Sequence, residues 1–477
     1  MSQAHKIFTN TVWQIVIRFF DVVLGVVNIG IITRLLGQTQ FGYYTTIFVF
    51  LQTIVTIADF GLFLALLNEI SSTEDKQVEA KRLNNIFTIR VVSILLFLSL
   101  SPLLIKIFPF SNFVKGGVVF LLGAYFWQSL ISTLTAVFSK YLDMAKATLV
   151  YVVAKAMYFV CLLYLFFNQG TLNQVLLWNS ISTGFGFLLL YIFLRRYQKL
   201  RFAWDFVYWR HVFKIAWPLA IGVVLNLLYF KADTLILSAY HTADKVGLYG
   251  AAYKVLEVLT TFPHMFMSLI LPLFTVAWAK QDLKKLNQIE QNTYDFFGII
   301  NIWVILVVWL ASKPIMILLT GQEFALAGAI LNVLILAVAA IFFGTMFTYL
   351  VVAMGLQRAM VKYYLLAAVL GLGAYFIFIP KYYYWAAAII TVLIESLIWF
   401  WAWRLVSKKI KIKLSNLVLV RSLLAAIVVF LLFYKFRFLP VILLVVLVSL
   451  SYFVLLFLFK AVDKNKIRLI LGKDKYV

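Results

Sequence analysis

The chain has 477 residues, of which 64% are hydrophobic and only 13% are charged, and its formal net charge is +24. Soluble domains have roughly 45–50% apolar and about 25% charged residues, so this composition excludes an ordinary soluble protein. Apolar runs of about 20 residues recur from end to end, which indicates membrane-spanning helices and not a barrel of short alternating strands. The predicted fold class is an all-α polytopic membrane protein.

These runs predict about fourteen transmembrane helices. Their approximate bounds are 10–33, 42–66, 86–107, 117–139, 147–167, 172–194, 212–239, 246–278, 293–319, 327–352, 359–379, 382–405, 417–434 and 439–459. The first run is long and carries Arg18 and Asp21. It therefore predicts a first transmembrane helix and not a cleavable signal peptide.

The longest polar linker, 195–211, follows the sixth predicted span. It divides the chain into an N-terminal six-helix lobe at 1–200 and a second six-helix lobe at 201–410. Two peripheral, lipid-facing helices follow at 411–460, and a basic cytoplasmic tail at 461–477. The motif FGYY at 41–44 resembles VGLY at 246–249, and each follows a long helix and a short polar link. These copies predict a parallel repeat with its axis along the membrane normal, although Gly-aromatic pairs are also common at helix starts.

Basic residues are concentrated on the links after even-numbered spans and in the C-terminal tail. The richest clusters are Arg195, Arg196, Lys199, Arg201, Arg210 and Lys214; Arg404, Lys408, Lys409, Lys411 and Lys413; and Lys460, Lys464, Lys466, Arg468, Lys473 and Lys475. Because cytoplasmic links carry an excess of Lys and Arg, both termini are predicted to be cytoplasmic. Positive charge placed there faces anionic lipid headgroups, so it does not indicate a nucleic-acid partner.

Polar residues recur at helical spacing within several spans, which places them on one helix face. The stripes with charged members are Gln14, Arg18, Asp21, Gly25 and Asn28; Thr45, Gln52, Thr56 and Asp59; Thr148, Tyr151, Lys155 and Tyr158; Gly222, Asn226, Tyr229 and Asp233; and Gly250, Lys254, Glu257, Thr261, His264 and Ser268. Such stripes can pack helix against helix. An aqueous cavity within the first twelve spans explains several charged stripes at once, and it is the favoured interpretation.

Each central charge costs about 2.5–3.5 kcal/mol to insert, so local pairing is expected. Arg18 with Asp21, and Lys254 with Glu257, have the i,i+3 spacing that allows an ion pair. Glu395 has no partner nearby in the sequence; a protonated or cross-paired carboxyl is favoured, and proton coupling stays open. Lys231 lies near an outer helix end and is expected to extend its ammonium group to the interface.

The sequence carries no P-loop, no dinucleotide-binding glycines and no paired metal-ligand motif. We therefore predict a transporter and not an enzyme, with no catalytic residue, metal site or cofactor. Without a nucleotide site, transport would be driven by the substrate gradient or by an ion gradient, with protons or sodium as the coupling ion.

Several segments together resemble the Wzx-type polysaccharide flippases of the multidrug/oligosaccharidyl-lipid/polysaccharide exporter superfamily. They are ITRLLG at 32–37, FGYY at 41–44, ADFGL at 58–62, the segment 217–233, and VGLYGAAYK at 246–254. The resemblance extends loosely over the first twelve spans. It implies two six-helix lobes that rock around a central cavity in a bacterial inner membrane.

The substrate implied by the resemblance is an undecaprenyl-diphosphate-linked oligosaccharide, used for surface polysaccharides such as O-antigen and lipopolysaccharide. Polysaccharide polymerase and chain-length proteins are the implied partners. The candidate substrate-binding residues are Arg18, Lys155, Lys254, Asn28 and Asn226. The candidates for gating or ion coupling are Asp21, Asp59, Asp233, Glu257 and Glu395.

Three alternatives remain at this point. A drug/cation antiporter of the same superfamily fits an acid in the first span, Asp21, although the nearby Arg18 fits it less well. A membrane-embedded glycan polymerase, ligase or glycosyltransferase typically needs a large external loop, and every predicted outer link here is short. A scaffold that transports nothing would leave the charges within the spans unexplained.

Overall fold

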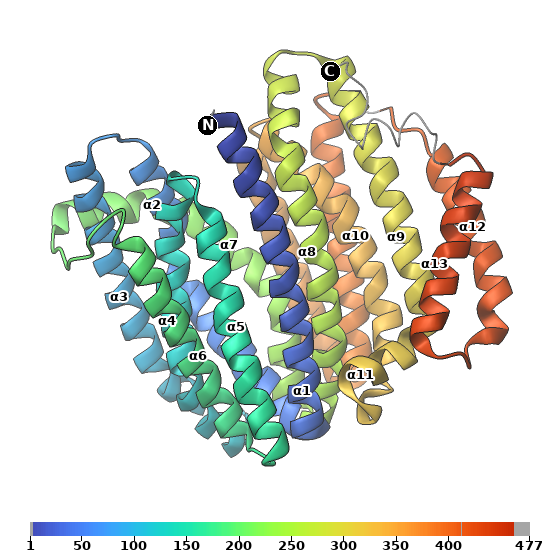
Figure 1. Cartoon of the computed structure of the whole chain (residues 1–477), viewed down its shortest axis with the longest axis horizontal. Helices are drawn as coiled ribbons and strands as arrows, with labels where there is room; N and C mark the ends of the chain where they lie inside the picture. The colour runs from blue at the N-terminus through green and yellow to red at the C-terminus, as the bar shows by residue number, and fades with distance from the viewer. Residues whose placement is uncertain (1–2, 412, 462–477) are drawn as a thin grey trace. The chain divides into compact units, whose positions relative to one another are not determined.

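The computed structural model describes residues 3–411 and 413–461 (Figure 1). Within these ranges the side chains of 3–12, 14, 15, 218, 219, 221–224 and 226–229 are not described. All regular elements in the described part of the chain are helical, which confirms the predicted all-α class.

Thirteen α-helices are described. They are α1 (Gln3–Asp59), α2 (Leu62–Ser71), α3 (Lys76–Ile107), α4 (Asn112–Lys140), α5 (Met144–Phe167), α6 (Leu172–Leu194), α7 (Phe206–Tyr240), α8 (Ala243–Ala279), α9 (Leu283–Thr320), α10 (Ala327–Ala353), α11 (Gln357–Ser407), α12 (Leu417–Phe433) and α13 (Val441–Leu458). Eleven of the described helical segments are long and apolar enough to cross a membrane.

Two of the elements, α1 and α11, are each two helices joined at a sharp bend. The predicted spans 359–379 and 382–405 both lie within α11, whereas the second predicted span, 42–66, begins in α1 and ends in α2. The bend in α1 lies at Gly37 (φ 67°), and the bend in α11 lies at Tyr383 (φ 53°). Positive φ suits glycine, which has no Cβ, but it strains a tyrosine. Contacts from the α7–α8 link hold the Tyr383 bend: Nε2 of His241 donates to the Ile379 carbonyl at 2.8 Å, and Lys245 Nζ lies 3.6 Å from the Tyr383 ring centroid. With these bends counted, the helices account for the predicted spans.

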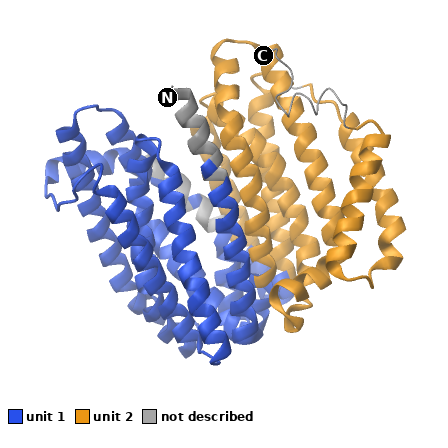
Figure 2. Ribbon diagram, viewed as in Figure 1, with its two compact units in different colours: residues 1–250, 375–384 blue, residues 251–374, 385–477 orange. Residues whose placement is uncertain are grey.

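The helices group into two compact units (Figure 2). Unit 1 comprises Met1–Gly250 and Tyr375–Tyr384, and unit 2 comprises Ala251–Ala374 and Trp385–Val477. Unit 1 thus includes α7 and the first turns of α8. The lobes at 1–200 and 201–410 were defined by sequence spacing, and as a functional division they stay a prediction.

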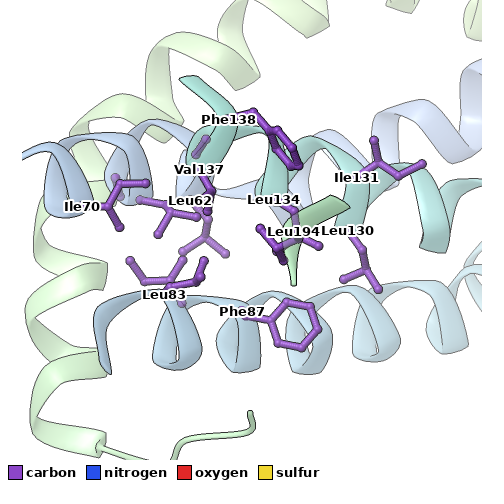
Figure 3. Packing of buried hydrophobic residues seen from close by; sticks show 14 of the residues in the cluster. Leu62, Ile70, Leu83, Phe87, Leu130, Ile131, Leu134, Val137, Phe138 and Leu194 are labelled. Atoms are coloured by element: carbon purple, nitrogen blue, oxygen red, sulfur yellow. The ribbon is translucent and has the colours of Figure 1, made fainter. Parts of the chain in front are cut away.

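A buried apolar cluster of unit 1 joins α2, α3, α4, α5, α6 and the start of α7 (Figure 3). Ile70, Leu83, Leu134 and Leu194 have no exposed surface there. Beside this core, the Glu79 carboxylate of α3 accepts hydrogen bonds from Lys140 at 2.6 Å and from Tyr141 at 3.1 Å. Burial and the Glu79 charge raise the pKa of Tyr141 to about 12, so this hydroxyl stays a donor. The core and this network fix the helix ends next to the long linker.

In unit 2, α12 and α13 pack along one face of α9. Val429, Leu444 and Tyr452 are buried in this cluster, whereas Leu431 and Ile442 on the other faces are 69% and 68% exposed. An apolar surface of this kind suits contact with lipid tails. The packing agrees with the predicted pair of peripheral C-terminal helices.

Candidate functional site

The polar face of α1 lies against α5 within unit 1. Lys155 Nζ is 2.7 Å from Asp21 Oδ1 and donates to the Asp21 carbonyl at 3.1 Å. Asn28 Nδ2 donates to the Lys155 carbonyl at 3.2 Å. At Gly25 a Cβ atom would lie 3.5 Å from Lys155 Nζ, so a larger side chain would crowd the ammonium group. Two stripes predicted separately from the sequence therefore meet in one polar contact.

The predicted pairing of Arg18 with Asp21 is wrong. Asp21 is paired with Lys155 from another helix, while Arg18 is exposed and lies near Tyr151. The Asp21 side chain is 12% exposed and that of Lys155 is 38% exposed. A buried carboxylate gains more from a partner fixed by packing than from a flexible neighbour on its own helix. Arg18 is thereby left available at the surface of unit 1.

A second ion pair crosses between helices of unit 1. Arg90 Nη1 of α3 lies 2.7 Å from Asp59 Oδ1 at the end of α1, and the Arg90 side chain is only 2% exposed. Asp59 was predicted as a candidate site residue, whereas Arg90 was not. A signal was present, because Arg90 falls inside the predicted span 86–107, where a charge is expensive.

Asp233 ties α7 to α8 within unit 1. Tyr249 Oη donates to its Oδ2 at 2.5 Å, and the Thr234 backbone N–H donates to its Oδ1 at 2.5 Å. Asp233 is 1% exposed, and its role in gating stays a prediction. Lys231 was expected to extend to the interface, which is wrong: it is 5% exposed, with Nζ 5.5 Å from the Phe230 ring centroid. The side chain of Asn226 lies outside the described residues.

In unit 2, Lys254 and Glu257 form the predicted i,i+3 pair on α8. Lys254 Nζ donates to Glu257 Oε2 at 2.8 Å, and each side chain is 26% exposed. Glu395 on α11 is 7% exposed and lies near Tyr364. The structure brings together Asp21, Asn28 and Lys155 in one unit, and Lys254 with Glu257 in the other.

The two copies of the Gly-aromatic motif lie against each other. A Cβ atom on Gly42 would be 1.8 Å from the Ala243 carbonyl oxygen, and one on Gly247 would be 2.2 Å from the Gln38 carbonyl oxygen. Gly42 thus faces Ala243, one helical turn before Gly247, and Gly247 faces Gln38, one helical turn before Gly42. Gln38 Nε2 also donates to the Asp244 carbonyl at 3.1 Å. This reciprocal contact requires glycine at both positions and places the two copies in equivalent roles.

The arrangement described so far, a bundle of long apolar helices with paired charges at membrane depth, defines a polytopic transport protein. The model of the polysaccharide biosynthesis protein family matches residues 7–278, and the MatE family model matches residues 218–377. The first match covers more than half of the chain. The chain therefore belongs to the polysaccharide biosynthesis protein family, within the multidrug/oligosaccharidyl-lipid/polysaccharide exporter (MOP) superfamily.

Solved structures of MOP transporters share the fold. The lipid II flippase MurJ in an inward closed conformation aligns with a TM-score of 0.79 at 13% identity, covering 94% of this chain and 98% of MurJ. An inward-facing multidrug-resistance MATE transporter aligns with a TM-score of 0.66 at 12% identity, covering 84% and 99%. A MOP transporter from Pyrococcus furiosus gives 0.58 at 14% identity, covering 85% and 96%. A search of curated protein sequences finds no match.

Proposed function

We propose that this protein moves an undecaprenyl-diphosphate-linked oligosaccharide repeat unit from the cytoplasmic to the outer leaflet of a bacterial inner membrane. It would do so by alternating access, with both termini in the cytoplasm, and would serve cell-surface polysaccharide biosynthesis. The observation that carries the proposal is the match to the polysaccharide biosynthesis family over residues 7–278. The fold similarity to a lipid II flippase supports it.

The α1–α5 contact has the chemistry to engage a diphosphate. The Lys155 ammonium is 38% exposed while its partner Asp21 is 12% exposed, so the ammonium keeps an accessible side. Arg18 is exposed on the α1 face that carries Asp21. Its guanidinium can bind two phosphate oxygens at once, whereas a lysine acts as a point charge. An incoming diphosphate would share Lys155 with Asp21, and Asn28 would keep the α5 backbone in place.

In unit 2, Lys254 would contact the substrate and Glu257 would hold the lysine when no substrate is bound. Asn226 is proposed as a further substrate contact. Asp59, Asp233 and Glu395 are proposed for gating or for coupling to protons or sodium, together with the two paired acids. Polysaccharide polymerase and chain-length proteins would use the exported repeat unit.

The second candidate function is an ion-coupled drug/cation antiporter. The MatE match over residues 218–377 and the MATE-like folds favour it. Deletion of the gene distinguishes the two. A flippase mutant accumulates lipid-linked oligosaccharide on the cytoplasmic leaflet and regains export when the wild-type gene is restored, whereas an antiporter mutant keeps normal lipid-linked oligosaccharide and becomes drug-sensitive.

The residue assignment is tested by Arg18→Ala and Lys254→Ala. We expect each to lower surface polysaccharide by roughly 10- to 100-fold at normal protein abundance, because a charge-assisted contact to phosphate contributes on the order of 1.5–3 kcal/mol. Lys254→Arg keeps the charge and serves as the matched control. Unchanged polysaccharide in both alanine variants would remove these residues from the substrate path.

A further inference from the structure

Unit 1 has a pocket of about 690 Å³ beside the bend of α1. Arg34 and Tyr43 of α1, Phe113 of α4, and Phe166, Gln169 and Asn173 around the α5–α6 link are among the residues that line it. Its volume is within the range of roughly 300–1,000 Å³ that is usual for small-molecule sites. Aromatic rings, amides and one guanidinium converge here, and none of them belongs to the charged contacts described above.

The aromatic rings form a wall of this pocket. Tyr43 and Phe113 are stacked with their centroids 5.5 Å apart and their planes 17° from parallel. Phe113 is nevertheless 71% exposed and Phe166 is 40% exposed. A phenylalanine on a lipid-facing surface is exposed because it contacts acyl chains, and Phe167, which is 80% exposed and does not line the pocket, fits that explanation. The aromatic rings that line the pocket next to its amide groups need a different explanation.

The α5–α6 link holds its amide groups in place. The Thr171 backbone N–H donates to Gln174 Oε1 at 2.8 Å in a capping box, and the Gly170 N–H donates to the Leu165 carbonyl at 2.8 Å. Gln169 has φ 50°, a conformation that costs energy for a residue with a side chain. The rim of the pocket is therefore ordered before any ligand arrives, which lowers the entropic cost of binding.

A second pocket of about 640 Å³ adjoins the first, and Tyr43 lines both. Ser111, Ser238, His241 and Asp244 contribute polar groups to it. The two pockets together extend from the α5–α6 link to the α7–α8 link at one end of unit 1. Polar groups that donate and accept hydrogen bonds, next to exposed ring faces, suit a ligand with hydroxyl groups on one side and apolar C–H surfaces on the other.

We propose that the two adjoining pockets bind neighbouring sugar rings of the exported oligosaccharide after its translocation. The ring of Phe113 would stack on one sugar, and Gln169, Asn173 and Arg34 would hold its hydroxyl or carboxylate groups. The links that form the pockets follow odd-numbered spans. The distribution of basic residues predicts that these links lie on the outer side of the membrane, opposite the cytoplasm. This inference rests on the proposed flippase function, and a site there would disfavour return of the glycan.

The test uses the full-length protein in phospholipid nanodiscs. The probe is the oligosaccharide released by mild acid from the lipid-linked repeat unit that accumulates in the deletion strain. We expect Phe113→Ala and Phe166→Ala to weaken its binding by about tenfold, as truncation of a central aromatic contact does. Phe167→Ala is the matched control and should bind as the wild type does. All three side chains are exposed, so loss of folding is not expected.

The outcomes separate this inference from the function on which it rests. If the deletion strain accumulates no lipid-linked oligosaccharide, the flippase proposal fails and this inference fails with it. If the oligosaccharide accumulates but its binding is equal in all variants, the flippase proposal stands and the pocket assignment is overturned. Loss of a retained phospholipid from Phe113→Ala in native mass spectra, with unchanged glycan affinity, would reassign the pockets to a lipid headgroup.

The predicted sidedness is tested in the same protein. Cys161 is the only cysteine, so Cys161→Ser gives a background free of thiols. In that background we expect Gln169→Cys to react with a membrane-impermeant maleimide in intact cells, and added oligosaccharide to slow the reaction. Labelling that occurs only in inverted vesicles would place the pocket on the cytoplasmic side and overturn the proposal.

Discussion

Two lysine–carboxylate pairs at membrane depth have nearly the same length and different structural settings. Lys155 and Asp21 are 2.7 Å apart and join two helices, α5 and α1, in unit 1. Lys254 and Glu257 are 2.8 Å apart and belong to the same helix, α8, in unit 2. The carboxylate of the first pair is 12% exposed, whereas both members of the second pair are 26% exposed.

The difference indicates what each pair contributes. A pair between helices depends on their packing, and the loss of one partner leaves a charge in a site with little water. A pair within one helix forms wherever the helix forms, and its partners can separate without moving the backbone. We therefore infer that the first pair stabilises unit 1, while the second can open for a substrate at little cost.

The largest expected effect comes from Lys155→Met. It leaves the Asp21 carboxylate without its cation and should lower the free energy of unfolding by about 3 kcal/mol, the low end for a buried pair because Lys155 is partly exposed. Lys254→Met should cost less than about 0.5 kcal/mol. Thermal unfolding in detergent measures both, and equal losses would contradict the comparison.

A double-mutant cycle isolates the pair from the packing. Asp21→Asn combined with Lys155→Met should recover part of the stability lost in the single lysine variant, giving a coupling energy of about 1–2 kcal/mol. The matching cycle with Glu257→Gln and Lys254→Met should give less than about 0.5 kcal/mol. The same equilibrium unfolding assay serves both cycles. A larger coupling on α8 would reverse the assignment of roles.

A smaller effect is expected from Glu395→Gln. This substitution keeps the shape of a buried side chain and removes its capacity for charge, so protein abundance should match that of the wild type, and the pH profile of export should shift only if the carboxyl relays protons. Export measured between pH 5 and pH 8 checks this. An unchanged profile would remove Glu395 from a proton pathway.

The smallest effect concerns an exposed pair outside the membrane. Lys81 Nζ lies 2.8 Å from Asp205 Oδ2, and hydrogen bonds from Lys81 and from the Tyr208 backbone lower the pKa of Asp205 below 3.8. The contribution of this pair to the free energy of unfolding is therefore present above that value, and it is lost as pH falls through the lower pKa of Asp205 in the folded protein. Asp205→Asn should slightly reduce the loss of unfolding free energy that the wild type shows as the pH becomes acidic. If the substitution changed the unfolding free energy only near neutral pH, a different titrating group would be responsible.

The sequence was sufficient for the helices but not for all of their partners. Long apolar runs specify helices, and the i,i+3 spacing specified the Lys254–Glu257 pair. The same spacing suggested Arg18 for Asp21, yet the structure pairs Asp21 with Lys155, which is 134 residues away. Arg90 was overlooked for a related reason, since its partner Asp59 lies on a different helix. Pairing across helices depends on rotation and crossing, which periodicity does not encode.

The bends show what spacing gives and what it leaves out. A link between the first two spans was predicted, and the helical backbone does break there, at Gly37, so α1 is two helices joined at a kink. The two adjoining pockets were not predicted, because their residues come from four separate segments of the chain. A sequence shows Phe166 and Phe167 as equivalent neighbours, and only the fold distinguishes the one that lines a pocket.

The reciprocal glycine contact can form only after the ribosome has synthesised α8. Gln38 and Asp244, which join its two sides, are 206 residues apart in the chain. At roughly 5–20 residues per second, the ribosome needs about 10–40 s to make that interval. Throughout that time the surface around Gly42 has no α8 to cover it, so lipid or an insertion factor must occupy it. The N-terminal half is therefore inserted early but completes its packing late.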